Sequence, residues 1–264
     1  MNTNKLYELA LPLLARRIVP DWLIAYAVRH STKTMLRSQW QMLSSTERQV
    51  YQQAFIARLK DSPIAIHTTD ANEQHYELPT EFFELVLGPR LKYSACYWPE
   101  HVTTLAAAEE DMLQLTAKRA QIEDGQSILE LGCGWGSLCL WLAENYPNCK
   151  LVAVSNSRTQ RAYIERQAAA RGLHNVQVIT ADMNDFEIDQ QFDRVLSIEM
   201  FEHIKNYETL MAKIAQWLRP EGLLFVHIFT HHEYAYAFEA GEDDWMTQYF
   251  FAGGNMPSAN LLSN

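Results

Sequence analysis

Hydrophobic and polar positions follow two different periods along the chain. Up to about residue 100 the apolar residues recur at helical spacing, as Tyr51, Phe55 and Leu59 do at every fourth position. Ser44 and Glu47 precede this run with the spacing of a capping box, which satisfies backbone amides at a helix start. The pattern therefore predicts a helix that begins after Ser44 and ends before residue 63.

Two more helical segments follow before the period changes. Thr80 has a side chain able to cap a short helix, and Gly88-Pro89 would stop it. Apolar residues at positions 105, 108, 112 and 115 indicate a longer helix that leads to Gly125. We expect residues 1–100 to form an N-terminal helical subdomain that caps the active site of the domain after it.

Short apolar runs alternate with helical segments after residue 125. They predict strands at 128–131, 151–154, 176–179, 195–198 and 223–229. Between the last two runs, six apolar residues fall on one face of a helix predicted at 207–218, which Pro220 and Gly222 would end. Strands and helices alternating at this spacing predict an α/β fold with a doubly wound, mostly parallel, Rossmann-like sheet over residues 101–264.

The composition disfavours several classes of partner. The 264 residues carry a formal net charge of −10, which would repel nucleic acid and an anionic membrane. The apolar stretch at 6–28 contains Glu8, Arg16, Arg17 and Asp21 as well as two prolines, so it is too interrupted to span a bilayer. We expect no stable membrane insertion and favour a helical subdomain here over an interfacial helix.

Cysteine and histidine positions give no sign of a metal site. Neither metal-ligand spacing nor a disulfide framework is found among the four cysteines, which are Cys96, Cys133, Cys139 and Cys149. His231-His232-Glu233 invites a metal ion, but adjacent histidines point apart on any regular backbone. We therefore expect no metal, and free thiols in a reducing, cytoplasmic compartment.

A glycine-rich turn joins the first predicted strand to the helix after it. The segment is Leu129-Glu130-Leu131-Gly132-Cys133-Gly134-Trp135-Gly136. Glycines here let the backbone bend sharply and let a ligand approach where a Cβ would collide. A dinucleotide-binding turn has the spacing G-x-G-x-x-G, whereas the third glycine here comes one residue early. With an acid at the strand end, the segment resembles the first motif of class I methyltransferases.

The next two strand ends offer polar groups to the same ligand. Many enzymes of that class place an acid after the second strand to hold the ribose, but this chain has Val154-Ser155-Asn156-Ser157, with Gln160 one turn on. An uncharged polar cluster can still hydrogen-bond ribose hydroxyls. The third strand ends at Ala181-Asp182-Met183-Asn184, where a carboxylate or amide can meet the adenine amino group. A plain turn or cap role for Asp182 stays open.

Four longer segments carry a more specific resemblance. They are QHYELPTEFF at 74–83, KYSACYW at 92–98, SIEMFEH at 197–203 and YFFAGGNMPS at 249–258. With them the chain resembles the cyclopropane-fatty-acid synthase superfamily of class I S-adenosylmethionine-dependent methyltransferases, over about residues 70–264. Within that superfamily it is most similar to the coclaurine-type N-methyltransferases. The resemblance implies methyl transfer from S-adenosylmethionine to a small amine or alkaloid-like substrate, with S-adenosylhomocysteine as product.

The resemblance also implies roles for individual residues. The methionine end of the cofactor would lie at Tyr93 and Ser94, and the rest of its site would be lined by Glu130, Gly132, Gly134, Gln160, Asp182, Met183 and Asn184. The catalytic group would consist of Glu199 and His203, with Glu202 between them. Substrate contacts would come from Tyr76, Glu77 and His227, although His227 is equally interpretable as a core histidine.

Elementary chemistry agrees with the pair Glu199 and His203. An alkylamine with a pKa of about 10.4 is almost wholly protonated near pH 7, and an ammonium has no lone pair. Releasing the free amine costs about 1.4 kcal/mol per pH unit, roughly 4 kcal/mol overall. An imidazole oriented by a carboxylate is a suitable base. The alternative is that His203 only starts a helix and that Glu199 is a solvated acid. Several aromatic residues could surround a cationic substrate or the sulfonium, with core packing as the alternative for each. They are Tyr97, Trp98, Trp245, Tyr249, Phe250 and Phe251.

Two rival functions are weighed against amine methylation. Cyclopropanation of unsaturated phospholipid chains uses the same cofactor, but cyclopropane synthases typically carry a cysteine directly after the Tyr-Ser pair, where this chain has Ala95 and then Cys96. A non-catalytic binding protein is the second rival, because family members continue past the G-G-x-M-P-S segment and this sequence stops at Asn264. We expect the last strands of the sheet to be truncated. An oligomer is compatible with the sequence.

Overall fold

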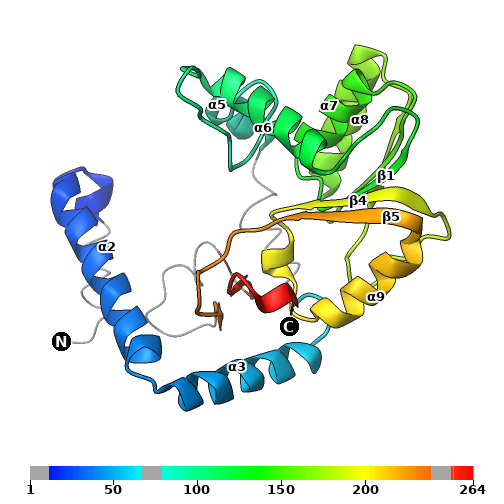
Figure 1. The fold of residues 1–264 in the computed structure, drawn as a ribbon. Helices are drawn as coiled ribbons and strands as arrows, with labels where there is room; N and C mark the ends of the chain where they lie inside the picture. The colour runs from blue at the N-terminus through cyan, green and yellow to red at the C-terminus, as the bar shows by residue number, and fades with distance from the viewer. Residues whose placement is uncertain (1–11, 67–78, 239–250, 252, 264) are drawn as a thin grey trace.

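The computed structural model describes residues 12–66, 79–238, 251 and 253–263. Its centre is a five-stranded parallel sheet in the order β3-β2-β1-β4-β5 (Figure 1). The strands are β1 (Ser127–Leu131), β2 (Lys150–Ser155), β3 (Val176–Thr180), β4 (Phe192–Ile198) and β5 (Leu218–His227). The chain starts in the middle of the sheet, moves to one edge and then returns to the other side. This confirms the doubly wound, Rossmann-like prediction and places a topological switch between β1 and β4.

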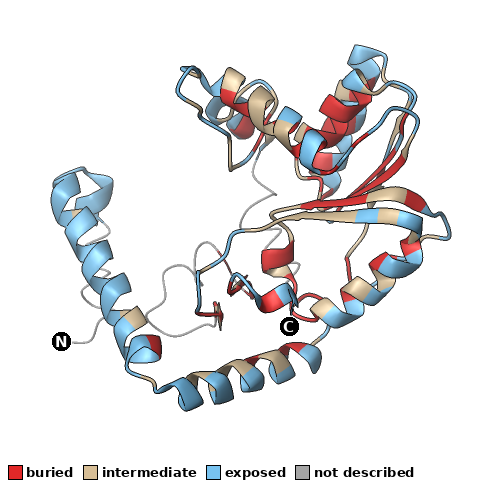
Figure 2. Cartoon of the chain, in the orientation of Figure 1, coloured by how far each residue is buried: buried red, intermediate tan, exposed pale blue. Residues whose placement is uncertain are grey.

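Helices cover both faces of the sheet. One face carries α6 (Leu105–Arg119), α7 (Ser137–Asn145) and α8 (Arg158–Arg171), and the other carries α9 (Tyr207–Trp217) (Figure 1). Neighbouring strand residues divide between the two layers, because side chains alternate along a strand. Ile128 and Leu196 pack among residues of α6 and α7, whereas Leu129 and Val195 pack with residues of α9. Figure 2 shows the resulting burial along the strands.

The fifth strand begins earlier than the hydrophobic pattern predicts. The helix predicted to reach 218 ends at Trp217, and β5 starts at Leu218 although it contains Pro220 and Gly222. Its pairing with β4 shifts register between Phe192 and Arg194, and such irregular ladders tolerate proline and glycine. The strand ends at residue 227, two residues before the predicted end.

Helices also precede the sheet, as predicted. They are α2 (Asp21–Leu36), which continues as the π-helix η1 (Arg37–Gln41), then α3 (Ser45–Lys60) and α5 (Thr80–Val86). The capping box is confirmed, since Ser44 N donates to Glu47 Oε2 at 2.7 Å and Glu47 N donates to Ser44 Oγ at 3.3 Å. The predicted cap at Thr80 is wrong, because Thr80 is already helical and Pro79 precedes it without a side-chain hydrogen bond.

The described part of residues 1–100 shares its packing with the sheet domain. Phe55 of α3 lies in one cluster with Ala235 and Leu261, and Phe83 of α5 packs in the cluster of α7 and α8. Helix α2 has no buried residue and stands apart from the sheet (Figures 1 and 2). An independent subdomain ending at residue 100 therefore stays a prediction. No helix in the described ranges is both long and apolar enough to cross a membrane.

A small second ladder lies after β5. β6 (Tyr236–Ala237) pairs antiparallel with β7 (Asn255–Met256), and the short turns η2 (Phe201–His203) and η3 (Leu261–Ser263) lie nearby. Asn255 is fully buried and ties the ladder to the residues after η2. Its Nδ2 donates to Ile204 O at 2.6 Å, and its Oδ1 accepts from Lys205 Nζ at 2.6 Å. This anchoring holds Phe251 against the turn that carries His203.

Candidate active site

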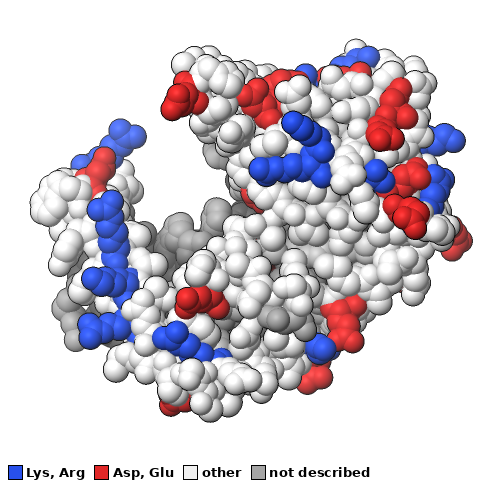
Figure 3. Space-filling view, in the orientation of Figure 1, with Lys and Arg blue, Asp and Glu red and all other residues white. Residues whose placement is uncertain are grey.

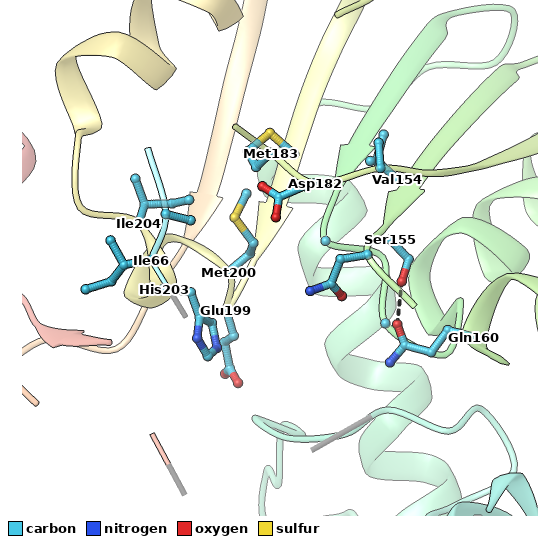
Figure 4. A pocket seen from close by; sticks show the side chains of 15 residues that line it. Ile66, Val154, Ser155, Gln160, Asp182, Met183, Glu199, Met200, His203 and Ile204 are labelled. Carbon is cyan, nitrogen blue, oxygen red and sulfur yellow. Dashed lines mark hydrogen bonds between the residues drawn. The ribbon is translucent and has the colours of Figure 1, made fainter. Parts of the chain in front are cut away.

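Two adjoining cavities open at the carboxyl ends of β1, β2 and β4. They share one side, since both are lined by Gly132, Gly134, Gln160, Glu199 and His203, and the two together are called the hollow. The first cavity extends towards the ends of β2 and β3, and Figure 4 shows its lining. The second extends towards α6 and the segment before it. A hollow at the carboxyl edge of an open parallel sheet, beside its topological switch, is where such folds bind ligands.

The glycine-rich turn forms the floor of this hollow. Gly132 and Gly134 have φ angles of +76° and +51°, which residues other than glycine rarely adopt. A Cβ on Gly132 would lie 2.7 Å from Met200 Cγ, so the turn packs tightly against the second residue after β4. A Cβ on Gly134 would meet no protein atom within 4 Å and would instead point into open space. The backbone at Gly134 therefore borders the hollow without a side chain between them.

The end of β2 presents uncharged polar groups, as the sequence indicates. Ser155 Oγ donates to Gln160 Oε1 at 2.6 Å (Figure 4). That bond fixes the orientation of the Gln160 amide, whose Nε2 is buried and has no hydrogen-bond partner. A buried donor without a partner is costly. Gln160 thus offers one oriented N–H to a ligand in the hollow.

The end of β3 contributes two of its three predicted residues. Asp182 and Met183 line the first cavity (Figure 4). Asn184 lines neither cavity, because its side chain is bound to the backbone of Ala65. Asn184 Nδ2 donates to Ala65 O, and Ala65 N donates to Asn184 Oδ1, both at 3.0 Å. Asn184 also donates to Asp182 Oδ1 at 2.9 Å. It therefore supports the wall and orients Asp182.

Opposite charges meet in the second cavity. Glu130, at the end of β1, is buried with Oε2 unpartnered, and burial raises the pKa of its carboxyl to about 8, although Lys92 works against this. Lys92 lines the same cavity, and burial lowers the pKa of its ammonium. Tyr93 and Ser94 line it as predicted. The sequence analysis missed Lys92, whose available signal was its position directly before the Tyr-Ser pair.

Glu199 and His203 face the hollow together. Glu199 follows β4 with φ +51°, a strained conformation for a residue with a side chain. Its amide donates to His227 O at 2.8 Å, and its Oε2 accepts a short hydrogen bond from Ser94 Oγ. The ring of His203 stacks on Phe251 at 4.4 Å between centroids. Figure 4 shows the carboxylate and the ring next to each other. Glu199 reaches the cavity from the end of β4, and His203 reaches it from the 3₁₀ turn η2, so the two residues do not lie on a common helix.

Glu202 and His227 do not line either cavity. The Glu202 carboxyl is completely buried behind the turn, where Oε1 accepts from Phe229 N at 2.8 Å and Oε2 has no partner. Burial raises the pKa of Glu202 to about 7. His227 is half-buried on β5, and burial lowers its pKa. Its backbone carbonyl accepts from the amide of Glu199, and both interpretations of its side chain stay predictions. Tyr76 and Glu77 lie outside the described residues.

The remaining candidates divide in the same way. Of the aromatic candidates, Phe251 lines the second cavity, whereas Tyr97 and Trp98 are exposed and line neither. Residues 245, 249 and 250 lie outside the described ranges. Phe229, which was not a candidate, also lines the second cavity. His231 Nδ1 accepts from the amides of Glu233 and Tyr234 at 3.1 Å and 2.8 Å, so it closes a turn. Within the described part of the chain no three metal-ligating side chains come together.

Comparison with known proteins places this geometry in a family. The family model of mycolic acid cyclopropane synthetase matches residues 65–264. The (S)-coclaurine N-methyltransferase of Thalictrum flavum subsp. glaucum is 41% identical over 249 residues, which are 93% of this chain and 68% of that protein. The cyclopropane-fatty-acyl-phospholipid synthase of Escherichia coli (strain K12) is 31% identical over 193 residues, 72% of this chain and 48% of that one.

A solved structure agrees over nearly the whole chain. A coclaurine N-methyltransferase bound to N-methylheliamine and SAH superposes with a TM-score of 0.90 and 40% identity, covering 98% of this chain and 75% of that one. Sequence and fold therefore point the same way. The chain belongs to the mycolic acid cyclopropane synthetase family, and within it stands with the coclaurine-type N-methyltransferases.

Proposed function

We propose that the protein is an S-adenosylmethionine-dependent N-methyltransferase acting on a small amine. The observation that carries this proposal is the shared hollow, in which the bare glycine turn lies on one side and the pair Glu199 and His203 on the other. The names of the relatives, which include coclaurine, tetrahydroprotoberberine and pavine N-methyltransferases, support an alkaloid-like amine as substrate.

The lining of the hollow fits the cofactor. Gly134 leaves a space that any Cβ would fill, and two buried polar atoms, Gln160 Nε2 and Glu130 Oε2, lack partners. Residues proposed to hold the adenosyl and methionine parts are Tyr93, Ser94, Glu130, Gly132, Gly134, Gln160, Asp182 and Met183. When bound, S-adenosylmethionine supplies a methyl group already activated as a sulfonium. The chain's own residues then need only to bind and orient the amine and to accept its proton.

Glu199 and His203 are proposed to prepare the amine. The Glu199 carboxylate attracts the substrate ammonium, and the His203 imidazole accepts the proton that must leave before nitrogen can attack. Ser94 binds the side chain of Glu199, and the carbonyl of His227 binds its backbone amide. Phe251 holds the His203 ring by stacking. Glu202 lies behind the turn, and we assign it a positioning role through the amide of Phe229 in place of direct contact with substrate.

The setting of the enzyme follows from charge and composition. With a net charge of −10, we propose that it acts on a small molecule and does not bind nucleic acid. On the face drawn in Figure 3, basic side chains follow α2, and both signs are mixed over the helices of the sheet. The four cysteines are free, which suits the proposed reducing, cytoplasmic location. We also propose that the protein does not insert stably into a membrane. An oligomer is compatible with this proposal.

Product analysis tests the proposal against its rival. The protein would be incubated with S-adenosylmethionine carrying a labelled methyl group, together with a panel of secondary and tertiary amines or with unsaturated phospholipid vesicles. We expect N-methylated amines by mass spectrometry and unchanged lipids. Cyclopropane fatty acids without methylated amines would show the alternative function, cyclopropane-fatty-acyl-phospholipid synthesis. Tight S-adenosylhomocysteine binding with neither product, across a broad panel, would point to a binding protein.

A further inference from the structure

Lys92 has an unusual position for a lysine. It is only 8% exposed, and of the described residues it is the only lysine or arginine that lines either cavity. The lining of the second cavity also includes the carboxyl groups of Glu130 and Glu199. A single strong cation therefore lies in an otherwise acidic hollow. Nothing in the proposed chemistry of proton removal uses it.

The backbone of this segment is built around a buried carboxylate. Glu109 of α6 is fully buried, and its two oxygens accept from the amides of Arg90 and Lys92 at 3.0 Å and 2.9 Å. Leu91, between them, adopts φ +50°. A Cβ at Gly88 would lie 2.3 Å from Glu109 Oε2, so the chain wraps closely around the carboxylate. This arrangement fixes the start of the Lys92 side chain in the wall of the cavity.

The ammonium at the end of that side chain has no direct partner. No hydrogen bond of Nζ is formed within the described residues, and no carboxylate oxygen there lies within 4.0 Å of it. Glu199, Glu130 and Glu109 act on it only at longer range. An ammonium in a largely buried wall is stabilised when a ligand brings an opposite charge into contact with it. A substrate ammonium would be repelled by this group, so the matching ligand atom is an anion.

We propose that Lys92 Nζ binds the carboxylate at the amino-acid end of the adenosyl ligand. This rests on the proposed function. The carboxylate of an amino acid needs a cationic protein group, and among the described lining residues of this cavity Lys92 is the lysine or arginine that provides it. The hydroxyl of Ser94 already donates to Glu199, so its proton is engaged elsewhere. Lys92 thus adds a cationic contact to the methionine end of the cofactor, which was expected to lie at Tyr93 and Ser94.

Ligand pairs that differ by one group test this assignment. S-adenosylhomocysteine would be compared with 5′-(3-aminopropylthio)-5′-deoxyadenosine, which keeps the amine and lacks only the carboxylate. In the wild-type protein, calorimetry should show about 10- to 100-fold weaker binding of the aminopropyl compound, the usual worth of a charge-assisted contact. Lys92→Met should weaken S-adenosylhomocysteine by a similar factor and leave the aminopropyl compound within about threefold. Lys118→Met, which removes an exposed charge from α6, is the matched control and should alter neither affinity.

Several results would overturn the proposal. Equal affinity of the wild type for both ligands would show that the carboxylate makes no such contact, whatever the variants do. An equal loss for both ligands in Lys92→Met would mean that Lys92 shapes the cavity or acts only on Glu199. Lys92→Gln serves if the methionine variant does not fold, and a thermal melt checks both. Failure of the wild type to bind either compound, in contrast, would reject the proposed function itself together with this inference.

Discussion

Replacing His203 separates base catalysis from support of the fold. The ring lines the hollow beside Glu199 and stacks on Phe251. At pH 7 an amine with a pKa of about 10.4 holds only about one molecule in 2,500 as free base. If His203 removes the proton, His203→Ala must rely on that fraction. We expect its kcat to fall about 10²–10⁴-fold at pH 7, which agrees with the usual worth of a positioned base.

The dependence on pH is the decisive part of this test. Between pH 7 and the amine pKa the free-base fraction rises about tenfold per unit, so the deficit of the variant should shrink by the same factor. The wild-type rate should level off once His203 is neutral. His203→Phe keeps an aromatic ring on Phe251 but removes the base, and it should match His203→Ala in both size and slope. His232→Ala, which removes a histidine side chain that is 90% exposed, is the control.

Initial rates with labelled cofactor, measured from pH 6.5 to 10 at saturating amine, provide the assay. Affinity for S-adenosylhomocysteine should change little in any of these variants. Glu199→Gln should cost less than His203→Ala if the carboxylate mainly orients the ring, and the double variant should be far from additive. A deficit of the same size at every pH would refute base catalysis and leave His203 as a substrate-positioning residue. A normal rate in His203→Phe would refute it as well.

Three further outcomes are expected. Gly134→Val should abolish S-adenosylhomocysteine binding by calorimetry, whereas Gly172→Val, at an equally open position with φ +67° away from the hollow, should only lower stability. Burial raises the pKa of Glu202 to about 7 in the folded protein, whereas the ordinary pKa of a glutamate is near 4.5. Between these two pH values the folded protein keeps a proton that the unfolded chain has lost, so the free energy of unfolding should decline as pH rises from about 4.5 to about 7. Glu202→Gln, which can still accept from Phe229 N, should reduce this decline in Tm. In cyclopropane synthases the cysteine that Ala95 replaces here helps to bind a bicarbonate base, so bicarbonate depletion should leave the methylation rate unaltered. A strong dependence on bicarbonate would favour cyclopropanation.

Much of the fold was predictable because it depends on local periodicity. Five strands and their helices were expected from apolar runs, and the structure contains each of them. The capping box at Ser44 was equally local, since both partners lie within one helical turn. The prediction was wrong where tertiary pairing outweighs local signals. Pro220 and Gly222 normally end a regular element, yet pairing with β4 draws them into an irregular part of β5.

The sequence by itself determined which residues can meet at the carboxyl edge of the sheet, because in a parallel sheet these strand ends share one edge. The glycine turn, Gln160, Asp182, Glu199 and His203 were all expected there, and all line the hollow. Only the tertiary structure decided which neighbouring side chains point away from the hollow. The amide of Asn184 is bound to Ala65, and the carboxyl of Glu202 to the amide of Phe229. Lys92 enters the site because Glu109 of α6, which comes 17 residues later in the chain, holds its backbone. Such partners lie 17 to 119 residues apart, so no periodicity in the sequence records which of them will meet.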